Sequence, residues 1–402
     1  MQLPLEDIKV LDLTHALAGP FCSTMLADYG AQLIKIEPPG EGDLARGWGV
    51  PITGGESSYF VSLHRNKRGI VLDMKKPEGK ELFFKLLEKS DVVIENYRVG
   101  ALKRLGIDYA EAKKRNPGII YCSISGFGQD GPYRDRAALD LILQSESGMV
   151  SVTGDEGSSG TRAGVSIADM TAGLYAAYGI MLALRMKEKT GEGQEIDISM
   201  LEGQLALLST MISAFCADGK VPKPTGNTYA ALVPYQIFHT KTRDLAIAIA
   251  GDKLWKKLCP TLGRPDLTDD ARFSRALERN KNRTTLLPML QEIFLTKPYE
   301  EWEPLLLAND IPVGAINNLA QVVEHPQVKA RNTLIEVEHP RAGKVRVIRS
   351  PVRLSKAPFA VRSPAPMLGQ HTQEVLRDVL GMKPAEIAAL EAAGALGAKP
   401  SK

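Results

Sequence analysis

The first half of the chain alternates short apolar runs with longer stretches of helical periodicity. Five runs rich in Val, Ile and Leu read as strands, over residues 8–13, 32–37, 69–73, 91–95 and 119–124. Helical patterns separate them, over 21–29 and over 78–88, where Pro77 stands at a first-turn position that tolerates proline. Strands that alternate with helices predict an α/β fold with a parallel sheet covered on both faces.

Ligands of such sheets bind in the loops that follow the carboxyl ends of the strands. Here those loops cover residues 14–20, 38–42, 96–100 and 125–132. The last contains Gly126, Gly128 and Gly131, a G-x-G-x-x-G pattern typical of dinucleotide sites. Pro132 follows at once, and no clean helix begins there with its N–H groups aimed at a pyrophosphate. We therefore interpret these glycines as a tight loop at a strand end.

The pattern changes in the second half. A run over 195–199 leads into one long apolar helix over 200–215, and a linker with two prolines follows over 219–226. A hairpin over 235–238 and 245–251 opens a different unit, which continues in charged helices around Trp255, Arg279 and Trp302. Its basic run over 272–283 is typical of a solvated helix face. A last section contains two strands, at 334–339 and 344–348.

Composition narrows the class of protein. The 402 residues carry 50 basic and 47 acidic side chains, and a net charge of +3 is too small to indicate a general nucleic-acid-binding surface. Four scattered cysteines without a C-x-x-C pair favour a reducing compartment over a disulfide framework or a zinc site. No signal-peptide pattern opens the sequence, and no apolar run spans a bilayer comfortably. We expect a cytoplasmic protein without nucleic-acid or membrane partners.

Asp169 is the most informative residue. It is the one acid in a small, apolar run over 164–173, and the apolar residues 174–184 that follow read as a buried helix. An acid at the start of a helix commonly satisfies free backbone N–H groups. A partly desolvated carboxylate on a rigid element can also act as a nucleophile or base. The local sequence leaves both interpretations open.

Other chemistry is less marked. Six histidines include no i, i+4 pair and no acidic cluster at metal-ligand spacing, and no G-x-S-x-G elbow is present. His15 follows the first strand, where function often collects, although a loop histidine is an equal explanation. Basic residues on predicted strand-end loops could together receive an anion; they are Arg46, Lys75, Arg98 and Arg104. Tyr97, flanked by an amide and a guanidinium, could stack on a base beside a phosphate.

Eight segments in order along the chain resemble the class III coenzyme A transferases, the family of formyl-CoA transferase and carnitine CoA-transferase. They are 10–14 with 18–20, 26–31, 34–37, 66–68, 95–97, 125–128, 189–194 and 368–372. The resemblance implies that Asp169 attacks an acyl-CoA thioester and forms an aspartyl–acyl anhydride, which CoA thiolate converts into an aspartyl-CoA thioester. An acceptor carboxylate then collects the CoA. Carboxylate chemistry of this kind needs no permanent cofactor, and the CoA thioester is a substrate.

The resemblance also implies a set of binding residues. Contacts to CoA would come from Leu17, Ala18, Leu72, Lys75, Asn96, Tyr97, Arg98, Arg104 and Leu139. On the acid-substrate side, Asp140 would lie near the reaction centre and Gly251 in a shortened glycine loop over it. His15 or Arg46 could pair with the substrate's distal charge. Backbone N–H groups would stabilise oxyanions, and water would be excluded from the anhydride.

Two departures and one relative define the alternatives. Pro38 replaces a family arginine that contacts phosphate, and Leu17 replaces a glutamine of formyl transfer, which argues against an oxalate acceptor. The related α-methylacyl-CoA racemases carry a histidine where this chain has Leu139, and two-base proton exchange then lacks one partner. A racemase-type epimerase is therefore the second hypothesis. A CoA-binding scaffold without turnover is the third.

Two later segments, 233–238 and 310–318, look most like the succinyl-CoA-dependent dicarboxylate branch, which implies an acceptor with two acidic groups. Family members combine a Rossmann-like large domain with a smaller α+β domain, and two ring-like chains interlock as a homodimer. By this resemblance, residues 1–220 form the first part of the large domain and 227–325 form the small domain. Residues 326–402 then return to complete the large domain.

Overall fold

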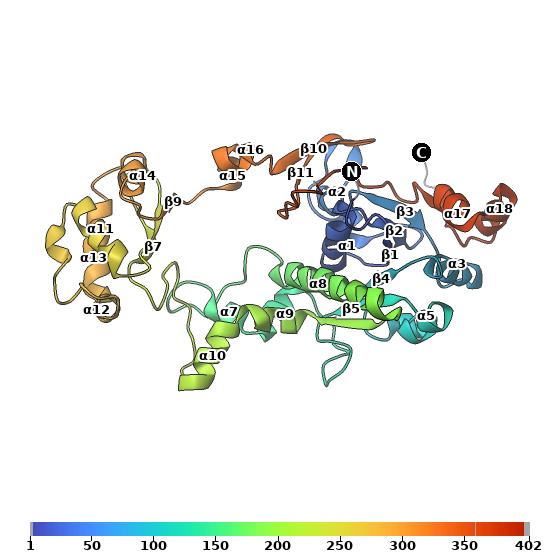
Figure 1. The fold of residues 1–402 in the computed structure, drawn as a ribbon, viewed down its shortest axis with the longest axis horizontal. Coiled ribbons are helices and arrows are strands. Elements are labelled where there is room, and N and C mark those ends of the chain that lie inside the picture. The colour runs from blue at the N-terminus through green and yellow to red at the C-terminus, as the bar shows by residue number, and fades with distance from the viewer. Residues whose placement is uncertain (1–2, 358, 398–402) are drawn as a thin grey trace. The chain divides into compact units, whose positions relative to one another are not determined.

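The computed structural model describes residues 3–357 and 359–397, which form two compact units (Figure 1). The larger unit takes the chain up to Met149, Ala163–Lys220 and the chain from Lys329 onward. The smaller takes Val150–Arg162 and Val221–Val328. Residues 150–162, which the family resemblance assigns to the large domain, thus belong to the smaller unit. There the Gly226 N–H donates to the Gly154 carbonyl oxygen at 2.8 Å.

A six-stranded parallel sheet forms the centre of the larger unit, in the order β3-β2-β1-β4-β5-β6. The strands are β1 (Lys9–Asp12), β2 (Gln32–Glu37), β3 (Lys67–Val71), β4 (Val92–Glu95), β5 (Ile120–Ser125) and β6 (Glu195–Ser199). All five apolar runs predicted as strands are confirmed, because strands buried on both faces read as nearly continuous apolar segments. The strand order reverses between β1 and β4, which is where sheets of this topology form a ligand crevice.

Helices cover both faces of this sheet (Figure 1). On one face, α1 (Ala18–Asp28) and α8 (Ile167–Thr190) pack together over Val92 and Ile120. The other face carries α3 (Pro77–Leu87), α5 (Tyr109–Arg115), α17 (Thr372–Leu380) and α18 (Pro384–Ala392). Phe83 of α3 is fully buried there. Pro77 occupies the first turn of α3, as predicted.

Shorter elements surround the sheet. In the larger unit they are η1 (Leu44–Gly47), η2 (Thr53–Gly55), α2 (Ser58–Leu63), α4 (Ala101–Leu105), α6 (Asp140–Glu146), β10 (Leu334–His339) and β11 (Gly343–Ile348). Two of the passages of the chain between the units fall within short helices, α7 (Met149–Val152) and α16 (Pro326–Ala330); the other two follow Arg162 and Lys220. The strands β10 and β11 pair antiparallel, which confirms the two late strands predicted from the sequence.

Two predictions about the apolar helices are wrong. The segment over 174–184 lies on α8 but is not buried all round, since Leu174 is 53% and Tyr178 62% exposed. The single helix expected over 200–215 is two helices, α9 (Met200–Leu207) and α10 (Ser209–Asp218), bent by 69° at Leu208. By length and composition α8 could cross a membrane, but it packs on α1 and on the central sheet as a core helix.

The smaller unit contains a three-stranded antiparallel sheet and helices. The strands are β7 (Tyr235–Phe238), β8 (Leu245–Ala248) and β9 (Val313–Ala315), and the first two confirm the predicted hairpin. The helices are α11 (Asp252–Thr261), η3 (Pro265–Leu267), α12 (Ala276–Lys281), α13 (Arg283–Phe294), α14 (Tyr299–Leu307) and α15 (Leu319–Glu324). The prediction that the basic run over 272–283 is a solvated helix face is wrong at Arg279. This side chain is fully buried and donates to the Val233 and Phe273 carbonyl oxygens and to Asp252.

Candidate active site

The candidate active site lies at the carboxyl ends of β1 and β4, where the strand order reverses. The loops that follow these two strands are joined side chain to backbone. The His15 N–H donates to Asn96 Oδ1 at 2.8 Å, and Asn96 Nδ2 donates to the His15 carbonyl oxygen at 2.9 Å. The structure thus brings together two of the four loops that the sequence predicts as ligand sites. The Asn96 amide serves to hold the loop after β1.

Asp169 stands in the first turn of α8, beside the start of α1. Its carboxylate accepts a hydrogen bond from the Ala18 N–H, the first residue of α1. Burial, and then the charge of Asp140, raise the pKa of Asp169 to about 7, while the Ala18 N–H acts in the opposite direction. A carboxylate with a pKa near neutrality, on a rigid helix and held by the amide of another helix, has the features of a functional group.

Asp140 caps α8 from a neighbouring helix. Its Oδ1 accepts the Ala168 N–H at 2.9 Å, and its Oδ2 accepts Gln144 Nε2 at 2.7 Å. Ser166, at the N-cap position of α8, makes no side-chain capping bond. An N–H at the start of α8 is therefore satisfied by Asp140, and the recorded partner of Asp169 belongs to α1. This arrangement favours the chemical interpretation of Asp169 over the capping one.

A glycine allows α1 and α8 to approach each other at the site. A Cβ atom on Gly173 would lie 2.6 Å from the Ala18 carbonyl oxygen and 3.1 Å from Phe21 Cδ1. Real side chains do not tolerate the shorter of these distances. The small residues after Asp169 in the sequence therefore bring the amide end of α1 within reach of the Asp169 carboxylate. The partial positive charge at that helix end favours an anion there.

Tyr59, on α2, is a site residue that sequence reasoning missed. Burial and the charges of Asp169, Asp43 and Asp140 raise the pKa of its phenol to about 12. The hydroxyl therefore stays protonated at neutral pH, within range of the Asp169 charge. Its ring packs edge-on against Trp48, at 5.7 Å between centroids. Nothing in the local Ser-Ser-Tyr-Phe pattern marks this tyrosine, since its role depends on folding α2 toward α8.

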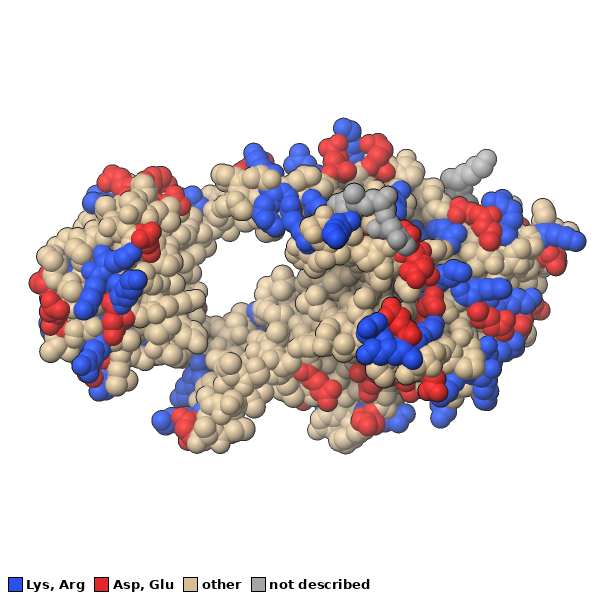
Figure 2. All heavy atoms as spheres, viewed as in Figure 1, with Lys and Arg blue, Asp and Glu red and all other residues tan. Residues whose placement is uncertain are grey.

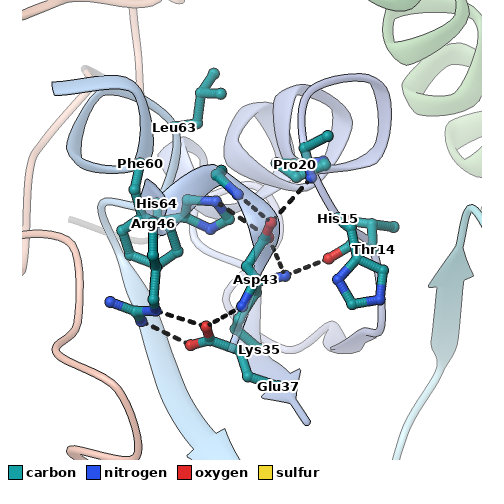
Figure 3. A network of polar contacts seen from close by, with 12 residues as sticks. Thr14, His15, Pro20, Lys35, Glu37, Asp43, Arg46, Phe60, Leu63 and His64 are labelled. Atoms are coloured by element: carbon teal, nitrogen blue, oxygen red, sulfur yellow. Dashed lines mark hydrogen bonds and ion pairs between the residues drawn. The ribbon is translucent and has the colours of Figure 1, made fainter. Parts of the chain in front are cut away.

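The two residues expected to pair with a distal substrate charge are already engaged. Arg46 forms a bidentate pair with Glu37, with both contacts at 2.7 Å, and its guanidinium lies 3.7 Å from the centroid of the Phe60 ring (Figure 3). Burial, followed by the Lys35 charge, lowers the pKa of His15, so that its imidazole is neutral at physiological pH. Neither side chain offers an unmatched positive charge.

The expected CoA cations follow β3 and β4: Lys75 and Arg98 lie on loops, and Arg104 lies on α4. Lys75, Arg98 and Arg104 are exposed, and no ion pair is recorded for them within residues 3–357 and 359–397. Arg98 lines a cavity of about 280 Å³ next to Glu95, at the end of β4. Tyr97 packs edge-on against His15, with 4.8 Å between ring centroids. These cations can bind phosphate groups, and this aromatic ring can stack on a nucleotide base.

Three further predicted residues have contrasting positions. The Leu72 side chain is buried in the core beneath α3, with 1% exposed. Leu139 is 72% exposed and precedes α6. Gly251, with a φ of 141°, forms the N-cap of α11 in the smaller unit, and no described atom outside its neighbouring residues lies within 4 Å of a Cβ built on it.

A largely apolar cavity of about 530 Å³ lies next to the starts of α1 and α8 within the larger unit. Leu17 and Met170, the chain neighbours of Ala18 and Asp169, form part of its wall with Phe21 and Leu174. Three arginines line the other side, at positions 331, 349 and 353; among the described residues no ion pair is recorded for any of them. An apolar chamber with uncompensated guanidinium groups suits an aliphatic chain that ends in an anion.

Comparisons with known proteins agree on one family. The family described as CoA-transferase family III matches residues 5–372. The chain is 39% identical to the succinyl-CoA:glutarate CoA-transferase of Homo sapiens, over 97% of this chain and 89% of that protein. It is 35% identical to a succinyl-CoA–D-citramalate CoA-transferase of Chloroflexus aurantiacus, over 97% of each. The crystal structure of a CAIB/BAIF family protein from Brucella suis, 36% identical, matches with a TM-score of 0.85, covering 94% of this chain and 100% of that one.

Proposed function

The chain belongs to CoA-transferase family III, and we propose that it moves CoA from succinyl-CoA to a dicarboxylic acid with Asp169 as the nucleophile. CoA thioesters are the substrates of such enzymes. The observation that carries the role of Asp169 is its carboxylate, which accepts the Ala18 N–H and has a pKa raised to about 7. Because Asp140 accepts a backbone N–H at the start of α8, the Asp169 oxygens are not needed as the N-terminal cap of that helix.

In the proposed reaction an Asp169 oxygen attacks the thioester carbonyl carbon, the carbon–sulfur bond breaks, and CoA leaves as a thiolate. The thiolate then attacks the Asp169 carbonyl carbon of the mixed anhydride, releases the donor acid and forms an aspartyl-CoA thioester. The acceptor carboxylate reverses these steps: it displaces the thiolate, and the thiolate attacks the acceptor carbonyl and frees Asp169. Each step exchanges one carboxylate or thiolate for another, so that no redox partner is required.

Support for the CoA position comes from the exposed cations. We infer that Lys75, Arg98 and Arg104 hold the phosphate groups and that Tyr97 lies against the nucleotide base. Leu17 and Ala18 then line the path by which the thioester reaches Asp169. The Ala18 N–H and the protonated Tyr59 hydroxyl are the donors that can stabilise an oxyanion beside the nucleophile.

Support for a dicarboxylic substrate comes from the cavity next to the starts of α1 and α8, which Leu17 and Met170 line. Its apolar wall suits a short aliphatic chain, and Arg331, Arg349 and Arg353 can receive the distal carboxylate. We infer this in place of Arg46, whose charge Glu37 already matches. The names of the human and Chloroflexus relatives, both succinyl-CoA-dependent, agree with this choice.

We further infer that two copies of the chain form an interlocked homodimer. Apolar side chains lie exposed along α8, α9 and α10; they are Leu174, Tyr178, Met181, Leu182, Leu205, Leu207, Met211, Ile212 and Phe215. Figure 2 shows a surface over α8 and α9 with few charges, whereas α17 and α18 carry mixed charges. An apolar surface of this kind is typical of a protein interface. The four cysteines are all free thiols, which agrees with a cytoplasmic enzyme.

The test combines one variant with a panel of acids. Asp169→Asn keeps the size of the side chain but removes the nucleophilic charge, so transfer should fall by at least about 10³-fold while the far-ultraviolet circular dichroism is unchanged. Glu78→Gln, a first-turn acid of α3 outside the site, is the control and should retain wild-type activity. Mass spectrometry would follow CoA from succinyl-CoA to mono- and dicarboxylic acids. Near-normal transfer by Asp169→Asn would refute the proposal.

The same assay separates the alternatives. A racemase-type enzyme would incorporate deuterium at the α-carbon of a 2-methylacyl-CoA in heavy water without any acceptor acid. A scaffold would bind CoA without turning over any acid of the panel. Transfer to dicarboxylic acids with no α-carbon exchange is the outcome that the proposal requires.

A further inference from the structure

The loop that places the Ala18 N–H at Asp169 has a strained backbone. Residues 13–17 connect β1 to α1, and within them Ala16 has a φ of 62°, a left-handed conformation that residues with a Cβ rarely adopt. Such a conformation persists where the surroundings impose it. The loop sets the position of Ala18, so the groups that hold the loop determine where its N–H points.

Asp12 accepts the Thr14 N–H of this loop at 2.9 Å, and two side chains that follow the neighbouring strands hold its next residues. Asn96, after β4, bonds both backbone groups of His15. Asp43, after β2, accepts the Ala16 N–H on Oδ1 at 3.0 Å, and the same oxygen accepts the Ala45 N–H at 2.9 Å. Asp43 therefore fixes the one loop residue whose backbone is strained.

Asp43 is held in turn by a buried lysine. Lys35 Nζ lies 2.9 Å from Asp43 Oδ2 and also donates to the Thr14 carbonyl oxygen, and both side chains are fully buried (Figure 3). Burial opposes the ionisation of Asp43, but the Lys35 charge and the Ala16 and Ala45 N–H groups outweigh it and lower the pKa of Asp43. The pair is thus ionised throughout the neutral range and makes a fixed contact with the loop at both Thr14 and Ala16.

We propose that Asp43, held by Lys35, is a positioning residue that fixes the loop before α1 and so aims the Ala18 N–H at Asp169. The inference rests on the proposed role of Asp169. Asp43 is buried, with its oxygens engaged by the loop, by Ala45 and by Lys35, so it acts through the backbone and not on a substrate. The ionisable groups that face Asp169 are Asp140 on α6 and Tyr59 on α2. A substitution at Asp43 leaves Asp140 in place and removes one of the charges that raise the pKa of Tyr59, whose hydroxyl stays protonated at neutral pH.

The first test is Asp43→Asn. The amide introduced by this substitution cannot both accept the Ala16 N–H and pair with the Lys35 ammonium, so the hold on Ala16, just before α1, is weakened. Because a displacement of about 1 Å at a reacting group can cost 10²-fold in rate, kcat should fall about 10- to 100-fold, with KM for the acyl-CoA changed less than about threefold. Without the Ala18 N–H the Asp169 carboxylate is less stable, so the acid limb of the pH–kcat profile should move to higher pH.

Asp91→Asn is a matched control. The Asp91 carboxylate likewise accepts a backbone N–H, from Lys9 at 3.0 Å, and pairs with a lysine, Lys187 at 2.9 Å. It stands just before β4, at the amino ends of the strands and therefore opposite the candidate site, and is partly exposed. This variant should keep the wild-type kcat and acid limb whatever its melting temperature.

A double variant covers the case in which Asp43→Asn does not fold. Lys35→Met with Asp43→Asn leaves no unpaired buried charge, which proteins tolerate better than a broken pair. The introduced methionine cannot hold the introduced amide or the Thr14 carbonyl oxygen, so the loss of kcat and the shift of the acid limb should appear here too. A folded variant of either kind with the wild-type kcat and acid limb would overturn the inference while leaving Asp169 essential. Activity retained by Asp169→Asn would overturn the proposed function itself.

Discussion

Two groups of buried or partly buried acids lie at the same end of the central sheet and differ in their partners. Asp12 and Asp43, beside β1 and β2, contact Lys67 and Lys35 at 3.2 Å and 2.9 Å. Burial opposes the ionisation of both, yet these lysines and local hydrogen bonds lower the pKa of each. Glu95 and Asp169, at β4 and α8, have no recorded lysine or arginine partner within the described chain, and burial raises the pKa of each to about 7.

The difference separates acids with a structural role from acids that can take part in chemistry. Acids paired with buried lysines stay ionised and act as fixed attachment points for the loops after β1 and β2. Acids without such partners can gain or lose a proton near neutral pH, and perturbed groups of this kind collect at functional sites. Asp169 belongs to the second group and Asp43 to the first, although the loop over 13–17 contacts Asp43 directly and leads into the Ala18 N–H that Asp169 accepts.

Removing a lysine from the paired group should have the largest effect on stability. Lys67 Nζ contacts Asp12 Oδ2 at 3.2 Å, Ser23 Oγ at 2.7 Å and the Pro20 carbonyl oxygen at 3.2 Å, all buried. Lys67→Met leaves Asp12 with less compensation and should lower the free energy of unfolding by about 3–5 kcal/mol. Urea denaturation at pH 7 measures the change.

Lys114→Met provides the control for that experiment. Lys114 pairs with Glu111 at 2.6 Å on the surface of α5, where solvent screens the pair and its contribution to stability is small. Equal losses in the two lysine variants would show that the buried pairs do not form a structural frame, and the comparison would fail.

The unpaired group should respond with the opposite sign. The pKa of Asp169 is about 7 in the folded state against 3.8 for an unperturbed aspartate, so the folded state holds this proton between about pH 4 and 7. Its ionisation costs stability as pH rises through that window. Asp169→Asn, inactive by proposal, should therefore unfold at a higher temperature than wild type at pH 8, with a free energy of unfolding larger by roughly 1–3 kcal/mol. Near pH 4 the two proteins should unfold at the same temperature.

Asp43→Asn makes the same exchange in the paired group and should destabilise the protein at pH 8, since it breaks a buried ion pair. Thermal melts of both variants at pH 4 and pH 8 check the two signs. If Asp169→Asn lowered the melting temperature at pH 8, its carboxylate would be a structural acid like Asp43.

The sequence predicts one of these groups better than the other. The strands can be predicted because strands buried on both faces form apolar runs. The ligand-binding loops can then be predicted because the strands of a parallel sheet all end at the same side. Asp169 stands out because its neighbours are small and apolar. In the sequence, Lys35 and Lys67 look like ordinary solvated lysines. Their burial depends on ion pairs with Asp43 and Asp12, which lie in other segments of the chain.

The same limitation explains the other misreadings. Arg279 sits in a basic run that looks solvated, and only the fold brings the Val233 carbonyl oxygen and Asp252 to its guanidinium. On α8, apolar residues occur all round the helix, so that the pattern does not say which side stays exposed. Tyr59 has no local mark at all. Local patterns predict elements and the loops at their ends, whereas contacts between distant segments decide which charged groups are buried.

The smallest predicted effect tests how Asp140 tunes Asp169. After burial, the Asp140 charge is the next cause of the raised pKa of Asp169. Asp140→Asn removes that charge, while its Oδ1 can still accept the Ala168 N–H, so the start of α8 is preserved. The acid limb of the pH–kcat profile should move to lower pH by about 0.5–1 unit, the reverse of the shift expected for Asp43→Asn. Steady-state rates between about pH 5 and pH 9 measure it.

Glu146→Gln, at the other end of the same helix α6, is the matched control. Glu146 pairs with Arg136 at 2.9 Å on the surface, so its replacement should leave the acid limb in place. A limb that does not move in Asp140→Asn would belong to a different acid, and Glu95, with its pKa also near 7, is the group to examine next. Glu95→Gln would then abolish the limb while Asp169 remained the nucleophile, because Glu95 accepts the Tyr97 N–H and could govern the CoA loop after β4 by its protonation.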